Sequence, residues 1–446
     1  MHHRVLAVLL VSLSFSTAAA QYDAARPEPV GGIGGTVIVH DGEELSHAVG
    51  SLIEELADDG AAVVTISGAA VEDAGALVAH VAGGGVLVVV GEGVRALNAS
   101  KVIPGAFVTV GFETEEGRAR LFDVLGRHPD AVGLGVHTGG TLVVRGRRLF
   151  GQRSGATAVV EASERRALRE ERLRGREGAD LVALSRSARA RLRPTFPAAE
   201  PPKPAVPNGR LVIAGGGGLS AAVIGAFLEG AGGLDAPIVY VPCTESVVVD
   251  PDPGMVRMLR KSGATNVRVF HTKDRTRADE DEAFLAPLKE AKGVWFGGGR
   301  QWNFVDSYQH TEAHRLMHDV LARGGVIGGS SAGASIQADY MARGDPLGNL
   351  NIIAEGYEEG LGFLRGCAID QHFTQRGRQR DMVELKTAFP QLLGIGLDEG
   401  VAIVVEGSAA EVIGPRDGRA WFYASDDPIV VPPGATFDLA SRRRLF

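Results

Sequence analysis

Short apolar runs that end in glycine alternate with amphipathic stretches along much of the chain. In the C-terminal half the apolar runs include 211–218 (LVIAGGGG), 293–299 (GVWFGGG) and 325–331 (GVIGGSS). Residues 221–230 and 312–324, between them, carry apolar side chains at helical spacing. Strands that alternate with helices are typical of an α/β protein, so we predict a doubly wound, mostly parallel sheet with helices on both faces.

The length and one proline-rich segment predict two such domains. A chain of 446 residues exceeds one ordinary domain. Residues 186–207 contain six prolines, which disfavour helices and strands, so this segment is expected to be a semi-rigid linker. It would separate a domain at 30–185 from one at 208–446. The arginines of the segment, at 186, 189, 191 and 193, are expected to form a solvated face.

The two halves resemble each other in sequence. Residues 131–146 align without gaps on 392–407 with six identities, and 82–93 align more loosely on 323–334. Chance similarity between strands rich in valine and glycine is the alternative, but the ungapped match favours an internal duplication. The pair Asp398-Glu399 is replaced by His137-Thr138 in the first half. We therefore expect the first domain to be a degenerate, non-catalytic copy that packs as an intramolecular pseudo-dimer partner.

The N-terminal residues have the pattern of an export signal. A short basic start is followed by an apolar run at 6–13 and by three alanines at 18–20. The run is too short to span a bilayer, so a cleaved signal peptide at 1–20 is favoured over a membrane anchor. The protein is thus expected to be periplasmic or extracellular. Its net charge of −8 argues against a nucleic-acid partner.

The chain has two cysteines, Cys243 and Cys367. They could pair in an exported protein, but two cysteines do not make a disulfide framework. Each ends an apolar run, so buried thiols are the favoured interpretation.

Residues 324–334 (GGVIGGSSAGA) have the pattern of a nucleophile elbow. An apolar run leads into Ser331 and then into small residues, which a sharp strand-to-helix turn requires. The backbone N–H of Ala332 would then face a developing oxyanion. A purely structural glycine turn is the alternative.

Two further polar clusters follow apolar runs. His372 lies in 368–378 (AIDQHFTQRGR), where a strand is expected to end, and is the candidate base. The candidate acid is Glu399 or Asp398, in the turn at 394–400. A serine, a base and an acid are what nucleophilic hydrolysis requires.

The segments GGSSAGA (328–334), DQHFTQRGR (370–378) and GIGLDEG (394–400) resemble, in this order, the cyanophycinase branch of the S51 serine peptidases. The resemblance covers about 208–446 and implies a flavodoxin-like fold of the kind found in class I glutamine amidotransferases. It implies that Ser331 is the nucleophile, His372 the base and Glu399, rather than Asp398, the acid.

The resemblance also implies a set of binding groups. Gly298 or Gly299 would complete the oxyanion hole with Ala332. The side chains implied to hold the substrate are Gln301, Asp370, Gln371, Arg376 and Arg378. Two residues depart from the family pattern, Arg300 and Asp381, and an extra arginine beside the pocket would favour an acidic substrate.

Two other patterns have simpler interpretations. His310, His314 and His318 are spaced for one helix face and could bind zinc, but a solvated histidine face is favoured, and no metal or cofactor is expected. The glycines at 215–218 lack the residues of a phosphate loop, so a turn after the first strand is favoured.

These observations predict an exported serine peptidase of cyanophycinase type. It would hydrolyse aspartyl or β-aspartyl bonds in a peptide or polypeptide, with a cyanophycin-like polymer as one candidate, through an acyl-enzyme. An aspartyl dipeptidase-like enzyme and a non-catalytic peptide-binding protein are the alternatives. An amidotransferase-like activity normally uses cysteine at the elbow, where this chain has Ser331.

Overall fold

A computed structural model describes residues 32–42, 47–59, 61–67, 73–175 and 178–445. The predicted signal peptide at 1–20 lies outside the described residues. Within these ranges, the search for an apolar helix of membrane-spanning length found none.

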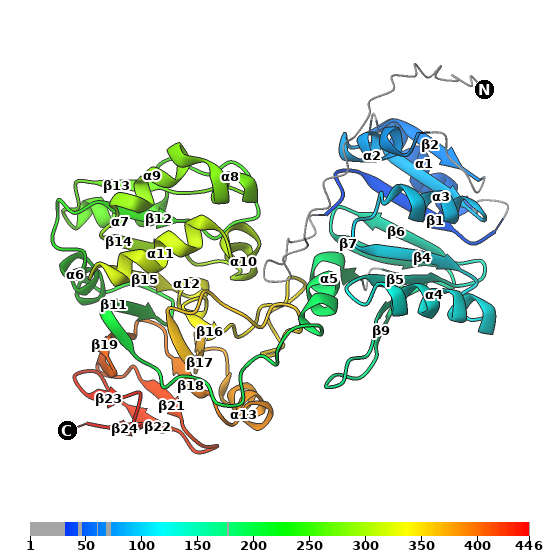
Figure 1. The fold of residues 1–446 in the computed structure, drawn as a ribbon. Helices are drawn as coiled ribbons and strands as arrows, with labels where there is room; N and C mark the ends of the chain where they lie inside the picture. The colour runs from blue at the N-terminus through cyan, green and yellow to red at the C-terminus, as the bar shows by residue number, and fades with distance from the viewer. Residues whose placement is uncertain (1–31, 43–46, 60, 68–72, 176–177, 446) are drawn as a thin grey trace.

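The first half of the chain forms two sheets, drawn in blue and cyan in Figure 1. The first sheet contains β1 (Thr36–His40), β2 (Val63–Ile66), β3 (Val86–Val90), β6 (Thr141–Arg145), β7 (Arg148–Gln152) and β10 (Ala179–Asp180). The second contains β4 (Ala106–Val110), β5 (Val132–Val136), β8 (Ala156–Val160) and β9 (Arg169–Leu173). Their helices are α1 (His47–Asp58), α2 (Ala74–Ala82), α3 (Gly93–Ser100), α4 (Glu115–Arg127) and α5 (Leu181–Ala190). The strand orders are β10-β7-β6-β1-β3-β2 and β4-β5-β8-β9.

The second half, green to red in Figure 1, also forms two sheets. The larger contains β11 (Val206–Ala214), β12 (Ile238–Val241), β13 (Val267–Val269), β14 (Gly293–Phe296), β15 (Val326–Ser330), β19 (Ala402–Gly407), β20 (Ala409–Ile413), β23 (Thr436–Asp438) and β24 (Arg443–Arg444). The smaller contains β16 (Ala338–Tyr340), β17 (Leu364–Gln371), β18 (Leu393–Leu397), β21 (Ala420–Tyr423) and β22 (Ile429–Val431). The helices are α6 (Ala221–Gly230), α7 (Gly254–Lys261), α8 (Arg275–Glu280), α9 (Glu282–Glu290), α10 (Trp302–Tyr308), α11 (Glu312–Ala322), α12 (Ala332–Ser335) and α13 (Gln379–Ala388). Their strand orders are β13-β12-β14-β15-β11-β19-β20-β23-β24 and β16-β17-β18-β21-β22.

The larger sheet of the second half is covered on both faces. Leu211 and Ile213 of β11 pack in one core cluster with residues of α11, whereas Val212 packs in another with Ile224 and Phe227 of α6. Alternate side chains of a strand point to opposite faces, so a strand buried on both faces is apolar throughout. This is the doubly wound layering that the sequence predicted, and it confirms an α/β fold.

The prediction of mostly parallel sheets was wrong. Eleven of the twenty strand pairings in the described part of the chain are antiparallel. The parallel pairs form one side of each sheet, and antiparallel strands extend the other side. A parallel pair needs a crossover of a dozen or more residues, whereas one residue joins β19 to β20 and two join β6 to β7. Connections this short force antiparallel pairing.

The two halves share strand order and strand sense. The series β2-β3-β1-β6-β7 is matched by β14-β15-β11-β19-β20, and β4-β5-β8-β9 by β17-β18-β21-β22. At the end of β3, Gly91 has φ 51° and donates its N–H to His40 O at 3.4 Å. At the end of β15, Ser331 has φ 58° and donates its N–H to Ala214 O at 3.1 Å. Gly91 thus occupies, in the first half, the position that Ser331 occupies in the second.

The predicted linker differs from the structure at its N-terminal end. The segment from Arg186 to Ala190 belongs to α5, which lies between the two halves in Figure 1. Arg186 is buried, and the side chain of Arg191 is only 4% exposed because it bonds to Glu355 at 2.8 Å. The prediction of solvated arginines is therefore wrong for these two residues, which hold the halves together.

Candidate active site

Ser331 stands at a sharp turn between β15 and α12. Its backbone has φ 58° and ψ −116°, outside the regions that side-chain-bearing residues normally adopt. The turn is tight, because a Cβ on Gly329 would lie 2.2 Å from Gly333 O and a Cβ on Gly333 would lie 2.1 Å from Phe296 O. The small residues of the motif are therefore required by the close approach of backbone segments, as a nucleophile elbow demands.

His372 directly follows β17 and contacts the serine. Its Nε2 lies 2.8 Å from Ser331 Oγ, and its Nδ1 lies 2.5 Å from Glu399 Oε1. An ionised carboxylate can only accept hydrogen bonds, so Nδ1 carries the proton and Nε2 accepts from the serine hydroxyl. The three side chains follow β15 of the larger sheet and β17 and β18 of the smaller sheet, so the site lies where the carboxyl ends of strands from two sheets meet.

The geometry distinguishes Glu399 from its neighbour Asp398. Asp398 is buried and accepts hydrogen bonds from Thr374 N at 3.1 Å, Thr374 Oγ1 at 2.8 Å and Arg419 N at 3.2 Å. Its carboxylate therefore holds the loop after His372, while Glu399 contacts the imidazole itself.

Two predicted oxyanion donors lie at the serine. Ala332 is the first residue of α12, where backbone N–H groups lack partners within the helix. A Cβ on Gly298 would lie 3.5 Å from Ser331 Cβ and 4.0 Å from Oγ, which places this glycine beside the nucleophile. Gly299 instead packs on Cys243, because its Cβ would lie 2.5 Å from Cys243 O. Gly298 is thus better placed than Gly299 to complete the hole.

The sequence analysis missed the role of the glycines at 215–218. A Cβ on Gly216 would lie 2.2 Å from His372 Cε1, and a Cβ on Gly217 would lie 2.9 Å from Glu399 Cβ. The carbonyl of Gly215 accepts the N–H of His372 at 2.7 Å. This turn therefore forms the wall behind the base and the acid. The four consecutive glycines directly after the first strand of the second half were the sequence feature that could have predicted this close packing.

Of the two predicted substrate-binding glutamines, Gln371 contacts the serine, whereas the amide of Gln301 bonds to the backbone. Ser331 Oγ lies 3.5 Å from Gln371 Oε1. Gln301 is buried, and its Nε2 donates to Ala342 O at 2.5 Å and to Arg343 O at 2.9 Å. Gln301 thereby fixes the segment after β16, and its amide nitrogen is occupied by that segment.

Asp370 and Arg378 were predicted to contact the substrate, and the structure places them in a buried ion-pair network instead. Asp370 is fully buried and pairs with Arg378 at 2.9 Å and with Arg343 at 2.9 Å. Asp381 completes the network by pairing with Arg343 at 2.5 Å. The departure from the family pattern at Asp381 is thus explained, since two guanidinium groups require a second carboxylate. These residues position the strand end that carries Gln371 and His372.

Arg376 and Arg300 have different surroundings. Arg376 is exposed and lies close enough for its charge to act on His372. Arg300 bonds through Nη2 to the carbonyl of Asp345 and, at 2.5 Å, to that of Gly348. Arg300 therefore fastens the loop after β16, and Arg376 is the more accessible of the two cations.

Burial shifts the titration of the candidate base. The pKa of His372 lies below its usual value, mainly because of burial. The charges of Arg376 and Arg378 lower this pKa further, and the hydrogen bond to Glu399 opposes them. The imidazole is therefore held neutral, the form that can take a proton from Ser331.

The histidines of α11 do not form the predicted solvated face. His314 Nε2 and His318 Nε2 lie 2.9 and 2.8 Å from Leu361 O, and burial lowers the pKa of His314 to about 4. Both imidazole rings can be neutral and carry the proton on Nε2, from which each donates a hydrogen bond to the carbonyl oxygen of Leu361. A search of the described residues for three clustered metal-ligating side chains found none. Cys243 and Cys367 are free thiols.

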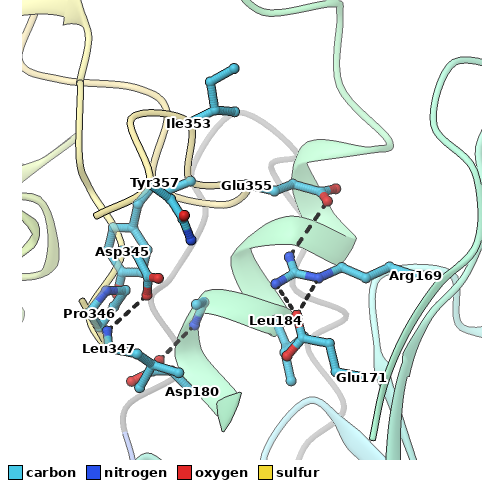
Figure 2. A pocket seen from close by; sticks show the side chains of 13 residues that line it. Arg169, Glu171, Asp180, Leu184, Asp345, Pro346, Leu347, Ile353, Glu355 and Tyr357 are labelled. Carbon is cyan, nitrogen blue, oxygen red and sulfur yellow. Dashed lines mark hydrogen bonds and ion pairs between the residues drawn. The ribbon is translucent and has the colours of Figure 1, made fainter. Parts of the chain in front are cut away.

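A separate cavity of about 270 Å³ lies between α5 and the loop at 345–357, as Figure 2 shows. Its charged residues pair with one another. Arg169 bonds to Glu171 and lies 3.5 Å from Glu355, and the buried Asp180 pairs with Arg147. The cavity is thus bounded by both halves of the chain, and its charges are largely compensated from within.

Comparison with known proteins gives a family for the second half. Residues 211–413 match the model of Peptidase family S51. The chain is 30% identical over 220 residues to cyanophycinases of Synechococcus elongatus and Thermosynechococcus vestitus, covering 46% of this chain and 67% of each relative. It is 27% identical over 219 residues to the cyanophycinase of Geminocystis herdmanii, covering 46% of this chain and 80% of that protein. Among solved structures, a peptidase from an acI-B1 actinobacterium matches with a TM-score of 0.43 and 18% identity, covering 52% of this chain and 97% of that one.

Proposed function

Because the chain belongs to peptidase family S51 and is a serine-type peptidase, we propose that Ser331, His372 and Glu399 are its catalytic triad. The observation that carries the proposal is the unbroken line of contacts, 2.8 Å from Ser331 Oγ to His372 Nε2 and 2.5 Å from Nδ1 to Glu399. A serine hydroxyl becomes a useful nucleophile only beside a base, and the base works best when an acid fixes its tautomer.

The first half-reaction would form an acyl-enzyme. As Ser331 Oγ attacks the carbonyl carbon of the scissile bond, its proton passes to His372 Nε2 and the carbonyl electron pair moves to oxygen. The N–H groups of Ala332 and Gly298 would stabilise this oxyanion, and Glu399 would stabilise the imidazolium. The intermediate then collapses, the carbon–nitrogen bond breaks, and His372 donates its proton to the leaving amine.

The second half-reaction would use water. His372, neutral again, takes a proton from water while the oxygen attacks the acyl carbon. The bond to Ser331 Oγ then breaks, and the proton returns from His372 to the serine. The low pKa of the buried imidazole favours both steps near neutral pH, since each begins with the neutral base.

The substrate is proposed to be a peptide or polymer that contains aspartyl or β-aspartyl bonds, such as cyanophycin. The cyanophycinases among its relatives support this choice. Gln371 beside the serine and the exposed Arg376 near His372 supply a neutral and a cationic group for such a substrate. The guanidinium of Arg376 would pair with a substrate carboxylate.

We also propose that the first half is a non-catalytic copy of the second and serves as its pseudo-dimer partner. Glycines stand at two of the three triad positions, Gly91 at that of Ser331 and, after β4, Gly111 at that of His372, and Thr138 stands at that of Glu399. Gly111 has φ 64° where His372 has φ 50°. Small-angle scattering of the whole chain tests the packing, because the paired halves give a compact particle and separated halves would contradict the proposal.

Export is the remaining proposal. The pattern at 1–20 predicts cleavage before Gln21. Sequencing of the N-terminus of the protein recovered from the periplasm or the medium tests it. A chain that keeps Met1 and stays in the cells would contradict export.

The deciding experiment measures release of the β-Asp-Arg dipeptide from insoluble cyanophycin by the protein and by Ser331→Ala. Release that the variant abolishes would establish the nucleophile and the substrate together. A serine-directed phosphonate is the parallel probe. Labelling of Ser331 without release of the dipeptide would support the peptidase mechanism and reject cyanophycin as the substrate. The absence of both labelling and release would favour a peptide-binding protein.

A further inference from the structure

A cleft rich in arginine lies where α5 and the residues after it meet the segment at 356–359. We name it the arginine cleft; it has a volume of about 280 Å³. Its charged residues are Arg166, Arg186, Arg189, Arg193, Glu358 and Glu359. Four guanidinium groups against two carboxylates leave its walls with a net positive charge. A second cleft of about 600 Å³ adjoins it and shares Arg166 and Arg193.

Arg186 is the buried cation of the arginine cleft. It is 8% exposed, and it donates from Nε to Gly356 O at 2.7 Å and from Nη2 to Gln309 Oε1 at 2.5 Å. Its third contact is the ring of Tyr357, 4.8 Å from the guanidinium carbon. All of these partners are neutral, and among the described residues no ion pair joins a carboxylate to Arg186, although its charge acts on Glu359 from farther away and lowers the pKa of that carboxyl. Buried charges are normally paired, so this one is placed to meet an anion from outside the chain.

Arg193 faces the same space. It is half-buried, and it has no ion pair with a carboxylate in the part of the chain that the structure describes. Its pKa is lowered by burial and by the charges of Arg186 and Arg189, against the opposing charge of Glu359. Glu359 also faces His310, at 3.7 Å. An anion in the cleft would relieve the repulsion among the arginines.

The cavity of Figure 2, which is also lined by residues of α5, provides the contrast. There Glu355 lies against Arg191 at 2.8 Å and Asp180 against Arg147 at 2.5 Å, so carboxylates of the chain already occupy the guanidinium groups. Arg166, at the edge of the arginine cleft, is likewise paired with Glu358 at 3.0 Å. Arg186 and Arg193 therefore differ from these arginines, because Glu359 is the carboxylate whose charge acts on both and it forms an ion pair with neither.

We propose that the arginine cleft binds the carboxylates of an acidic peptide and serves as an accessory site for the substrate. Guanidinium groups pair with carboxylates through two parallel hydrogen bonds, which a lysine cannot offer. One helix connects this cleft with the catalytic site: α10 begins directly after Gln301 and ends before Gln309, the partner of Arg186. The identity of the ligand as substrate rests on the proposed peptidase function.

The test uses the full chain with Ser331→Ala, so that the probe is not cleaved. Fluorescence anisotropy measures the Kd of a fluorescent hexa-aspartate peptide, with hexa-asparagine as the neutral comparison. We expect Arg193→Glu to weaken hexa-aspartate binding about tenfold, which corresponds to about 1.4 kcal/mol. The matched control is Arg174→Glu, an exposed arginine of the first half that lines neither cleft, and it should leave the Kd unchanged. If Arg193→Glu does not fold, Arg193→Gln carries the same test with an effect of about threefold.

Each outcome has a distinct meaning. Equal affinity for the two peptides, or equal weakening by the variants at 193 and 174, overturns the arginine cleft as a carboxylate site. A parallel experiment measures the labelling of Ser331 by the serine-directed phosphonate in the protein without the Ser331→Ala substitution. If Ser331 is labelled but Arg193→Glu leaves the Kd of hexa-aspartate unchanged, only the proposed binding role of the arginine cleft is rejected. If Ser331 is not labelled, the proposed peptidase mechanism is rejected, whatever the binding result.

Discussion

The guanidinium carbon of Arg147, in the turn between β6 and β7, lies 4.3 Å from the ring centroid of Trp302 in α10. The same guanidinium donates to Asp306 at 2.8 Å and to Tyr357 at 2.7 Å. Trp302 directly follows Gln301 and the glycine turn that includes Gly298. A residue of the first half thus supports the helix behind the proposed oxyanion hole.

Arg147→Ala is expected to destabilise the second half by about 3 kcal/mol, because it leaves the buried Asp180 and the half-buried Asp306 without their cation. Urea denaturation followed by tryptophan fluorescence measures this, since all three tryptophans lie in the second half. Arg148→Ala is the control, because this neighbour stacks on Phe150 within the first half. Equal midpoints for the two variants would show that Arg147 does not stabilise the contact.

Glu399→Gln is expected to lower kcat by roughly 10³-fold, because an amide can hold the imidazole in the wrong tautomer and does not stabilise the imidazolium. Asp398→Asn is the comparison, since Asp398 bonds to Thr374 and not to His372. It should change kcat by less than about tenfold. The reverse order of effects would assign the acid to Asp398.

Arg376→Gln is expected to move the acidic limb of kcat/KM to higher pH. The pKa of His372 is lowered first by burial and then by Arg376, so removal of this charge raises it. At a given acidic pH less of the base is then neutral, and the rate falls. The pH profile of Arg380→Gln, an exposed neighbour, is the control. A limb that stays in place, or moves to lower pH, would show that Arg376 does not act on the base.

Gly216→Ala is expected to lower kcat about 100-fold, because its methyl group would lie 2.2 Å from His372 Cε1 and φ at this position is 105°. Gly218→Ala should change kcat by about twofold or less, since a Cβ there meets nothing within 4 Å. The rate of phosphonate labelling at Ser331 provides a second readout. Equal rates for the two variants would exclude Gly216 as the wall of the site.

The three proposed triad residues could be found in the sequence because each follows an apolar run. In α/β folds functional side chains gather at the carboxyl ends of strands, so local patterns were enough to nominate Ser331, His372 and Glu399. They could not show that β15 lies in one sheet and β17 and β18 in another, whose ends the fold brings together. The choice between Glu399 and Asp398 needed family resemblance, since both precede the same strand. In the structure their side chains contact different partners, His372 and Thr374.

The predictions that were wrong depend on contacts between distant residues. The polar, proline-rich sequence around Arg191 predicts a solvated side chain, yet its partner is Glu355, which is 164 residues away in the sequence. The family resemblance implies that Asp370 holds substrate, but in the structure Asp370 is buried and its carboxylate pairs with Arg343. The local sequence around a carboxylate does not predict which distant arginine will form an ion pair with it.

The backbone conformation of Ser331, which the proposed nucleophile elbow requires, lowers the stability of the folded protein. A residue with a side chain at φ 58° and ψ −116° costs about 1–3 kcal/mol relative to a relaxed conformation. Glycine tolerates such angles, and the first half has Gly91 at this position, with φ 51°. We therefore expect Ser331→Gly to be inactive yet to melt at a higher temperature than Ser331→Ala, by calorimetry. Under the proposed catalytic role of Ser331, its hydroxyl is retained at a cost in the stability of the second half, which Gly91 avoids at the matching position of the first half.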